Sequence, residues 1–276
     1  EINGDNTDVQ TMFVDVDESK MKVLIGNNNF LLVDEAQKIG NVGNMLKIAA
    51  EKFDDVKVIV TGSSAFKLAE AVNESLTGRK REFRLYPLSF KEMADETSAL
   101  EESRMIDHRL IYGYYPEVVT SPGDEKEVIK ELIDSYLYKD VLEENDIAKQ
   151  DKLVRLVQAL AFQIGSTVSA NELAGLVGVD AKTVERYIDI LEKCYIIFTL
   201  PSYAKNKRNE LKFARKIYFW DMGIRNGVIG NMAPVSLRSP EELGHMWENF
   251  LVAERIKRND YAGRTFVQHY FWRTQQ

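Results

Sequence analysis

Two adjacent carboxylates, Asp34 and Glu35, directly follow an apolar run at residues 30–33 (FLLV). Such a run is typical of a buried strand. A carboxylate at the end of a strand can hold Mg²⁺ on a nucleotide phosphate, and a second one beside it can orient or deprotonate the attacking water. The alternative is a buried strand followed by an acidic turn, so the surrounding elements must decide between the two.

The N-terminal part of the chain alternates strand-like and helix-like segments from residue 12 to residue 73. We expect strands at residues 12–17 (MFVDVD), 30–35 (FLLVDE) and 56–64 (VKVIVTGSS), and helices at residues 43–53 and 65–76. This alternation predicts an α/β fold, with crossover helices and a parallel sheet whose strands are buried on both faces. Ligand chemistry then belongs at the carboxyl ends of the strands.

From Arg84 onward the pattern becomes mostly helical, and Pro87 interrupts the segment LYPLSFKEM. We expect a first domain at residues 1–98 and a helical connector at residues 99–150. Within the connector, residues 125–145 carry apolar side chains at spacings of three and four, which predicts a helix with one packed face.

Residues 151–222 form a more specific unit. A helix at residues 152–164 is followed by Ser169, which we expect to cap the next helix in a capping box with Glu172. Gly178 is placed to close that helix and Asp180 to cap the following one. Two strand-like runs, YIIFTLPSY and KIYFWD, come next. This order predicts a winged helix-turn-helix.

The segment between the two strand-like runs is basic. Six of the twelve residues from Lys205 to Lys216 are lysine or arginine. A basic hairpin after a helix-turn-helix is where a winged domain meets phosphate. The candidates for DNA contact are Lys182, Thr183 and Arg186 on the exposed side of the second helix, and Lys205, Lys207 and Arg208 on the hairpin.

Acidic residues on the same helix oppose DNA contact. Glu185, Asp189 and Glu192 would repel the backbone of a duplex. A winged helix with a purely structural or protein-binding role therefore stays open beside the DNA-binding hypothesis.

Several segments together resemble a known family. They are FLLVDEAQ (30–37), VIVTGSS (58–64), LTGRKREFRLYPLSF (76–90), YGYYPEVV (112–119), WENFLVAE (247–254) and YFWR (270–273). In this order they are similar to prokaryotic AAA-type ATPases of the AAA_14 family, whose C-terminal half is called DUF4143. The resemblance covers most of the chain, and FLLVDE resembles the Walker B motif with its catalytic glutamate.

The resemblance implies a P-loop NTPase that uses ATP and Mg²⁺. Asp34 would then hold Mg²⁺ and Glu35 would activate water, while Ser63 or Ser64 would sense the γ-phosphate. Arg79 would stabilise phosphate charge, in cis or in a neighbouring subunit; its alternative is a surface guanidinium in a basic turn. The resemblance also implies that residues 223–276 begin a module with a PD-(D/E)xK nuclease-like fold.

The chain departs from the family at both ends. No GxxxxGK[ST] loop occurs in the sequence, so the phosphate-binding amides and lysine of that loop are missing. The acidic motif that follows YFWR in the family is also missing. We therefore expect a fragment, truncated at both ends, that is inactive by itself, and we expect Glu248 and Glu254 to be packing or solvent-facing residues.

Composition limits the remaining classes. A net charge of −7 argues against a chain that coats nucleic acid over its whole surface. No apolar stretch is long enough to cross a bilayer, so we expect a cytoplasmic protein without a membrane partner. The expected partners are a nucleotide, with DNA, a second copy of the chain or another protein as further candidates. A DNA-binding module on a vestigial α/β scaffold and a pure interaction protein of a defence or toxin-like system are the alternative functions.

Overall fold

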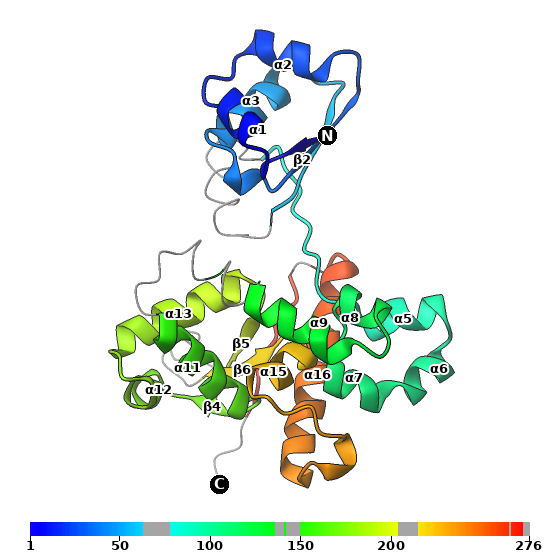
Figure 1. The fold of residues 1–276 in the computed structure, drawn as a ribbon, viewed down its shortest axis with the longest axis vertical. Coiled ribbons are helices and arrows are strands. Elements are labelled where there is room, and N and C mark those ends of the chain that lie inside the picture. Colours follow the sequence, from blue (N-terminus) through cyan, green and yellow to red (C-terminus); the bar gives the residue numbers. More distant parts are fainter. Residues whose placement is uncertain (63–77, 136–140, 142–149, 204–214, 265, 273–276) are drawn as a thin grey trace. The chain divides into compact units, whose positions relative to one another are not determined.

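The computed structural model describes residues 1–62, 78–135, 141, 150–203, 215–264 and 266–272. The chain forms two compact units, Glu1–Arg84 and Leu85–Gln276, and each is described by itself (Figure 1). Ser63, Ser64, the helix expected at residues 65–76, and the basic hairpin residues Lys205, Lys207 and Arg208 lie outside the described residues.

The first unit contains a parallel three-stranded sheet in the order β1-β2-β3. Its described elements are β1 (Ile2–Asn3), α1 (Thr7–Met12), α2 (Glu18–Ile25), β2 (Phe30–Asp34), the 3₁₀ helix η1 (Ala36–Lys38), α3 (Val42–Lys52) and β3 (Lys57–Val60). Val33, in the middle strand, pairs with Ile2 on one side and Val60 on the other. The predicted parallel sheet is confirmed, and α3 is the crossover helix between β2 and β3.

One face of this sheet carries the core of the first unit. Leu31 and Val33 of β2 are buried with Met21 of α2 and Met45 of α3. On the opposite face, Phe30 is 47% exposed and Ile59 of β3 is 49% exposed. The expectation that the strands are buried on both faces is therefore wrong, because α2 and α3 contribute their apolar side chains to the Leu31 and Val33 face.

The strand expected at residues 12–17 is wrong as well. Helix α1 ends at Met12, and a loop follows in which Phe13 and Val16 are buried in the core. Asp17 caps α2 by accepting a hydrogen bond from the Lys20 amide at 2.8 Å. The apolar residues of this run therefore anchor a connecting loop, and the first strand of the sheet is β1, which the sequence analysis did not anticipate.

The second unit is mostly helical. Its described helices are α5 (Phe90–Glu96), α6 (Ala99–Arg104), α7 (Ile106–Tyr112), α8 (Pro116–Thr120), α9 (Glu125–Leu132), α11 (Gln150–Phe162), α12 (Ala170–Val177), α13 (Ala181–Lys193), α15 (Met222–Val228), the 3₁₀ helix η3 (Val235–Leu237) and α16 (Pro240–Tyr261). The strands β4 (Thr167–Val168), β5 (Ile197–Pro201) and β6 (Arg215–Phe219) form an antiparallel sheet in the order β4-β6-β5.

The predicted helix ends between α12 and α13 are mostly confirmed. Gly178 closes α12 in the left-handed region with φ 76°, where a residue without Cβ is favoured. Asp180 caps α13 through the Thr183 amide at 2.9 Å. Ser169 occupies the N-cap position of α12, but its side chain makes no capping hydrogen bond, so the expected capping box with Glu172 is wrong. The backbone carbonyl of Ser169 takes the first helical bond, which fixes the position without the hydroxyl.

Helix α16 carries the WENFLVAE segment and completes the core of the second unit. The Asn249 side chain, which is 1% exposed, accepts from the Phe219 amide and donates to the Phe219 carbonyl, both at 2.8 Å. An asparagine amide presents one donor and one acceptor, so this side chain takes the place of a paired strand residue beside β6.

The two glutamates of this segment also have partners within the protein. Glu254 accepts from the Phe90 amide at 2.9 Å and from the buried Lys257 ammonium at 3.0 Å. Glu248 accepts from Lys216 at 2.7 Å and from the Tyr218 hydroxyl at 2.6 Å. Both glutamates are packing residues, as expected from the sequence.

Asn249→Ala should destabilise the second unit by about 2 to 4 kcal/mol, because it leaves a buried amide and a buried carbonyl of β6 without partners. Chemical denaturation of the full chain measures the change in the free energy of unfolding. Arg255→Ala, on an exposed position of the same helix, is the control. Equal effects of the two changes would contradict the pairing role of Asn249.

Candidate functional site

Residues from three segments meet at the carboxyl edge of the parallel sheet. Asp34 ends β2, Gly4 follows β1 and Thr61 follows β3. The Gly4 amide donates to the Asp34 carbonyl at 2.8 Å, and the Thr61 amide donates to the Val33 carbonyl at 2.9 Å. Parallel strands end together at one edge, and that edge is the usual place for a ligand in such sheets.

Asp34 has a partner on the β3 side. The Thr61 hydroxyl donates a hydrogen bond to Asp34 Oδ1. The sequence analysis assigned the polar role after this strand to Ser63 or Ser64 and missed Thr61. The signal for Thr61 is its position as the first polar residue after the apolar run of β3, level with the end of β2.

Glu35 leaves the sheet in a left-handed turn. Its backbone has φ 49° and ψ 42°, which is uncommon for a residue with a side chain. Gln37 Nε2 donates to Glu35 Oε2 at 2.7 Å. The chain therefore turns away from the direction of β2 at Glu35. The hydrogen bond from Gln37 fixes one oxygen of the Glu35 carboxylate.

A lysine on the same turn connects Glu35 with the segment after β1. Lys38 Nζ lies 2.6 Å from Asp5 Oδ1 and 3.6 Å from Glu35 Oε2. The hydrogen bond to Asp5 raises the pKa of Lys38 above its ordinary value, against a smaller opposing effect of burial. The spacing from Glu35 to Lys38 is visible in the sequence, but the contact with Asp5 depends on β1, which the sequence analysis missed.

The two adjacent carboxylates are thus drawn to opposite sides of β2. Asp34 is bonded to Thr61 on the β3 side, and Glu35 is paired with Lys38, whose other partner lies on the β1 side. This divergence reduces the repulsion between two like charges that are neighbours in the chain. It also gives the two groups different surroundings, as two different chemical roles require.

Gly4 allows β1 to approach this turn closely. A Cβ atom on Gly4 would lie 2.2 Å from the Glu35 carbonyl oxygen. Its φ is not in the left-handed region, so the requirement for glycine here is one of space alone. Gly4 therefore sets the distance between the β1 end and the Glu35 turn.

Arg79 is not brought to these carboxylates. Its guanidinium lies 3.3 Å from Glu51, in the last turn of α3. Because α3 runs from the carboxyl end of β2 back to the start of β3, Glu51 lies toward the opposite edge of the sheet. The structure places Arg79 at the surface of that end of the unit.

In the second unit, Lys182 and Arg186 of α13 are exposed. Thr183 contributes to the helix cap: its hydroxyl donates to Asp180 Oδ2 at 2.7 Å, and its amide bonds to the same carboxylate. Of the residues predicted to contact DNA, the described ones that present an exposed charge are therefore Lys182 and Arg186.

Two of the three acidic residues of α13 form ion pairs with cationic side chains. Glu185 pairs with Arg215 of β6, and Asp189 pairs with Lys193 at 2.8 Å. Burial raises the pKa of Glu192, and its hydrogen bond with Thr199 acts in the opposite direction. The repulsion expected from these three residues is therefore weaker than the sequence suggests.

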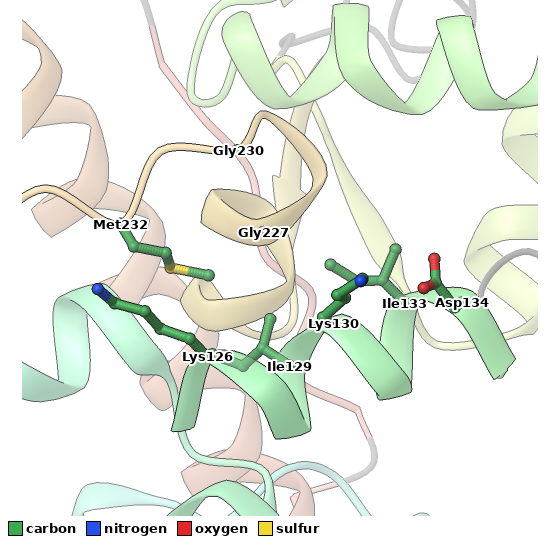
Figure 2. A pocket seen from close by; sticks show the side chains of 8 residues that line it. All are labelled: Lys126, Ile129, Lys130, Ile133, Asp134, Gly227, Gly230 and Met232. Carbon is green, nitrogen blue, oxygen red and sulfur yellow. The ribbon is translucent and has the colours of Figure 1, made fainter. Parts of the chain in front are cut away.

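A hollow of about 290 Å³ lies beside α9 and α15 in the second unit. Figure 2 shows the Lys126 and Ile129 side chains on α9 and the Ile133 side chain directly after it, with Gly227 and Met232 opposite them. A Cβ on Gly227 would lie 2.7 Å from Ile129 Cγ2 of α9 and 2.4 Å from Ile133 Cδ1, so α15 packs closely against α9 at this glycine. None of the predicted site residues lines this hollow.

The donor set at the sheet edge fits Mg²⁺ bound together with a phosphate. Within the described ranges, no group of three or more His, Cys, Asp or Glu side chains could hold a metal ion. Mg²⁺ is usually held by one or two carboxylates together with substrate phosphates and water. Asp34 with the hydroxyl of Thr61 beside it agrees with that mode and not with an all-protein metal site.

No helix in the described part of the chain is long and apolar enough to cross a bilayer.

Two family models match parts of the chain. Residues 1–94 match an AAA domain (AAA_14), and residues 103–234 match a domain of unknown function, DUF8612. The N-terminal part is therefore an AAA-type ATPase-like domain, as predicted. The model that matches the C-terminal part is DUF8612, where the sequence analysis expected DUF4143.

The curated relatives are uncharacterized proteins. One from Haemophilus influenzae is 26% identical over 73% of this chain and 52% of its own length. One from Methanocaldococcus jannaschii is 23% identical over 87% of this chain and 55% of its own length. One from Mycobacterium tuberculosis is 24% identical over 93% of this chain and 56% of its own length. The chain thus spans about half the length of the curated relatives it matches, and no solved structure matches it.

Gly4→Ala should destabilise the first unit by about 1 to 3 kcal/mol, because the new methyl group collides with the Glu35 carbonyl. Gly40→Ala is the control, since a Cβ there meets nothing within 4 Å. Thermal unfolding of the full chain measures both. A Gly4→Ala variant as stable as Gly40→Ala would contradict the close approach of β1.

Asp5→Asn should lower the pKa of Lys38, because the hydrogen bond to Asp5 is the largest cause that raises it. The stabilisation from this pair is fully present below the ordinary value of 10.5 and is lost as the pH rises through the folded-state pKa. An NMR titration of the Lys38 side chain measures the shift, with Asp8→Asn on α1 as the control. A pKa unchanged by Asp5→Asn would contradict the pairing.

Proposed function

We propose that the first unit binds a nucleoside triphosphate with Mg²⁺ at the carboxyl edge of its parallel sheet. We also propose that the whole protein, meaning the complete protein that contains this chain, hydrolyses ATP there. The observation that carries this proposal is the pair Asp34 and Glu35 at the end of the middle strand, with Thr61 beside it, within residues similar to an AAA domain.

Each group at this edge has a proposed role. Asp34 holds Mg²⁺ on the phosphates, and Thr61 orients the Asp34 carboxylate through its hydroxyl. Glu35 orients or deprotonates the attacking water. Ser63 or Ser64, which follow Thr61 in the chain, is proposed to contact the γ-phosphate. Arg79, which lies against Glu51 in its own unit, is proposed to act on the phosphate of a neighbouring subunit.

The sequence limits what this chain does alone. It contains no GxxxxGK[ST] loop, whose amides and lysine supply most of the affinity for phosphate in P-loop NTPases. We therefore propose that hydrolysis belongs to the whole protein, and that this chain binds the nucleotide weakly and does not turn it over.

A titration with a fluorescent ATP analogue, with and without Mg²⁺, tests this site in the chain and in the whole protein. Asp34→Asn should weaken Mg²⁺-dependent binding roughly 10-fold or more. In the whole protein, Glu35→Gln should keep binding and lower turnover by about 10²- to 10⁴-fold.

Asp55→Asn is the matched control, because Asp55 is exposed and precedes β3 at the other edge of the sheet. It should leave binding and turnover unchanged. The proposal fails if the whole protein does not bind ATP, or if Asp34→Asn behaves like Asp55→Asn.

A second candidate function is nucleic-acid contact by the second unit. The order α11, β4, α12, α13, β5, β6 with the sheet β4-β6-β5 supports a winged helix-turn-helix at residues 151–222. The specific observation in its favour is the compensation of Glu185 and Asp189 by Arg215 and Lys193, which leaves α13 with an exposed cationic side.

Lys182→Glu combined with Arg186→Glu should abolish salt-dependent binding of a DNA duplex to the full chain, since each replacement turns an attraction for phosphate into a repulsion. Lys126→Glu combined with Lys130→Glu, at two exposed positions of α9, is the control because it changes the net charge by the same amount. Fluorescence anisotropy over a range of salt concentrations measures the affinity. Equal losses in the variant and the control would show that α13 has no particular role.

A further inference from the structure

We infer that Lys38 is a positioning residue for Glu35: it fixes the glutamate carboxylate by joining it to the segment that follows β1. This inference rests on the proposed function, because it concerns the same sheet edge. It adds a residue that neither the motif nor the family resemblance pointed to.

The geometry gives Lys38 two partners from different segments. Its ammonium lies 2.6 Å from Asp5 Oδ1, which belongs to the turn after β1, and 3.6 Å from Glu35 Oε2, which belongs to the turn after β2. Asp5 is itself held, since its amide donates to the Asn3 side chain at 2.8 Å. Lys38 therefore links Glu35 to the turn that follows the neighbouring strand β1.

The backbone around this link is constrained on both sides. Gly4, next to Asp5, lies against the Glu35 carbonyl with no room for a methyl group, and the Glu35 backbone is left-handed. Gln37 holds the same carboxylate oxygen, Oε2, that faces Lys38. Gln37, through its hydrogen bond, and Lys38, through its ion pair, therefore act on the same oxygen of Glu35.

The solvent exposure of the ion pair between Lys38 and Asp5 favours a positioning role for Lys38 over a role in stabilising the fold. The Lys38 and Asp5 side chains are 42% and 56% exposed, and ion pairs at that exposure contribute little to stability. A Lys38 variant should therefore keep the fold, so a change in the Glu35 side chain can be measured without loss of structure. Without the ammonium, Asp5, Asp34 and Glu35 remain at one edge as three like charges, and repulsion favours other rotamers of Glu35.

The experiment has one readout without nucleotide and one with it. In the full chain, NMR side-chain couplings of Glu35 should report a single rotamer in the parent and in Lys38→Arg, and averaged rotamers in Lys38→Met. In the whole protein, Lys38→Met should lower kcat for ATP roughly 10- to 100-fold with little change in nucleotide affinity, because a misplaced base weakens the chemical step. Lys38→Arg should restore most of the loss.

Lys52→Met is the matched control, since Lys52 makes an exposed ion pair with Glu18 in the same unit. The inference would be overturned if the Glu35 side-chain couplings in Lys38→Met still reported a single rotamer. It would also be overturned if the whole protein hydrolysed ATP and Lys38→Met left its kcat unchanged. If the couplings average as expected but the parent protein hydrolyses no ATP, the positioning role stands and the proposed function fails. The two failures are thus distinguishable.

Discussion

Parallel pairing of β2 between β1 and β3 is the constraint on which the candidate site depends. Parallel strands end at the same edge, so Asp34 meets the backbone of Gly4 on one side and the Thr61 side chain on the other. An antiparallel neighbour would bring the opposite end of its strand to this place. The two carboxylates then have different partners, Thr61 from the next strand for Asp34 and Lys38, three residues further along the chain, for Glu35.

The sequence predicted the part of the site that is local. The run FLLVDE places Asp34 and Glu35 at a strand end, because apolar content and length distinguish such a strand without knowledge of its neighbours. The contact between Lys38 and Asp5 could not be predicted, since it depends on a two-residue strand, β1, too short to produce a periodic pattern. The strand predicted at residues 12–17 is wrong because its apolar residues belong to a loop. Phe13 and Val16 anchor that loop in the core, and in the sequence alone they look like strand residues.

In the second unit, the segments that carry the family resemblance make tertiary contacts that could not be predicted from the sequence. Lys257 is buried, and its ammonium is bonded to the Leu88 carbonyl and to Glu254. A buried ammonium needs such partners to offset its loss of hydration. PLSF is thus bonded to α16 at two points, through the Phe90 amide to Glu254 of WENFLVAE and through the Leu88 carbonyl to Lys257, while the Lys257–Glu254 ion pair lies within α16. Helix periodicity finds each segment but carries no information about this pairing.

The proposed function also makes a specific demand on the oxygen ligands at this sheet edge. A protein that binds Mg²⁺ without a substrate needs several oxygen ligands in fixed positions, whereas this edge has Asp34 as its direct candidate and turns Glu35 toward Lys38. Under the proposed function, the described residues leave the other positions around the metal to water, to phosphate oxygens and to residues outside the described ranges. The metal and the nucleotide would then bind as one unit, and the cation Lys38 would keep the neighbouring carboxylate from acting as a second metal ligand. That arrangement reserves Glu35 for water, which is the division of roles that hydrolysis requires.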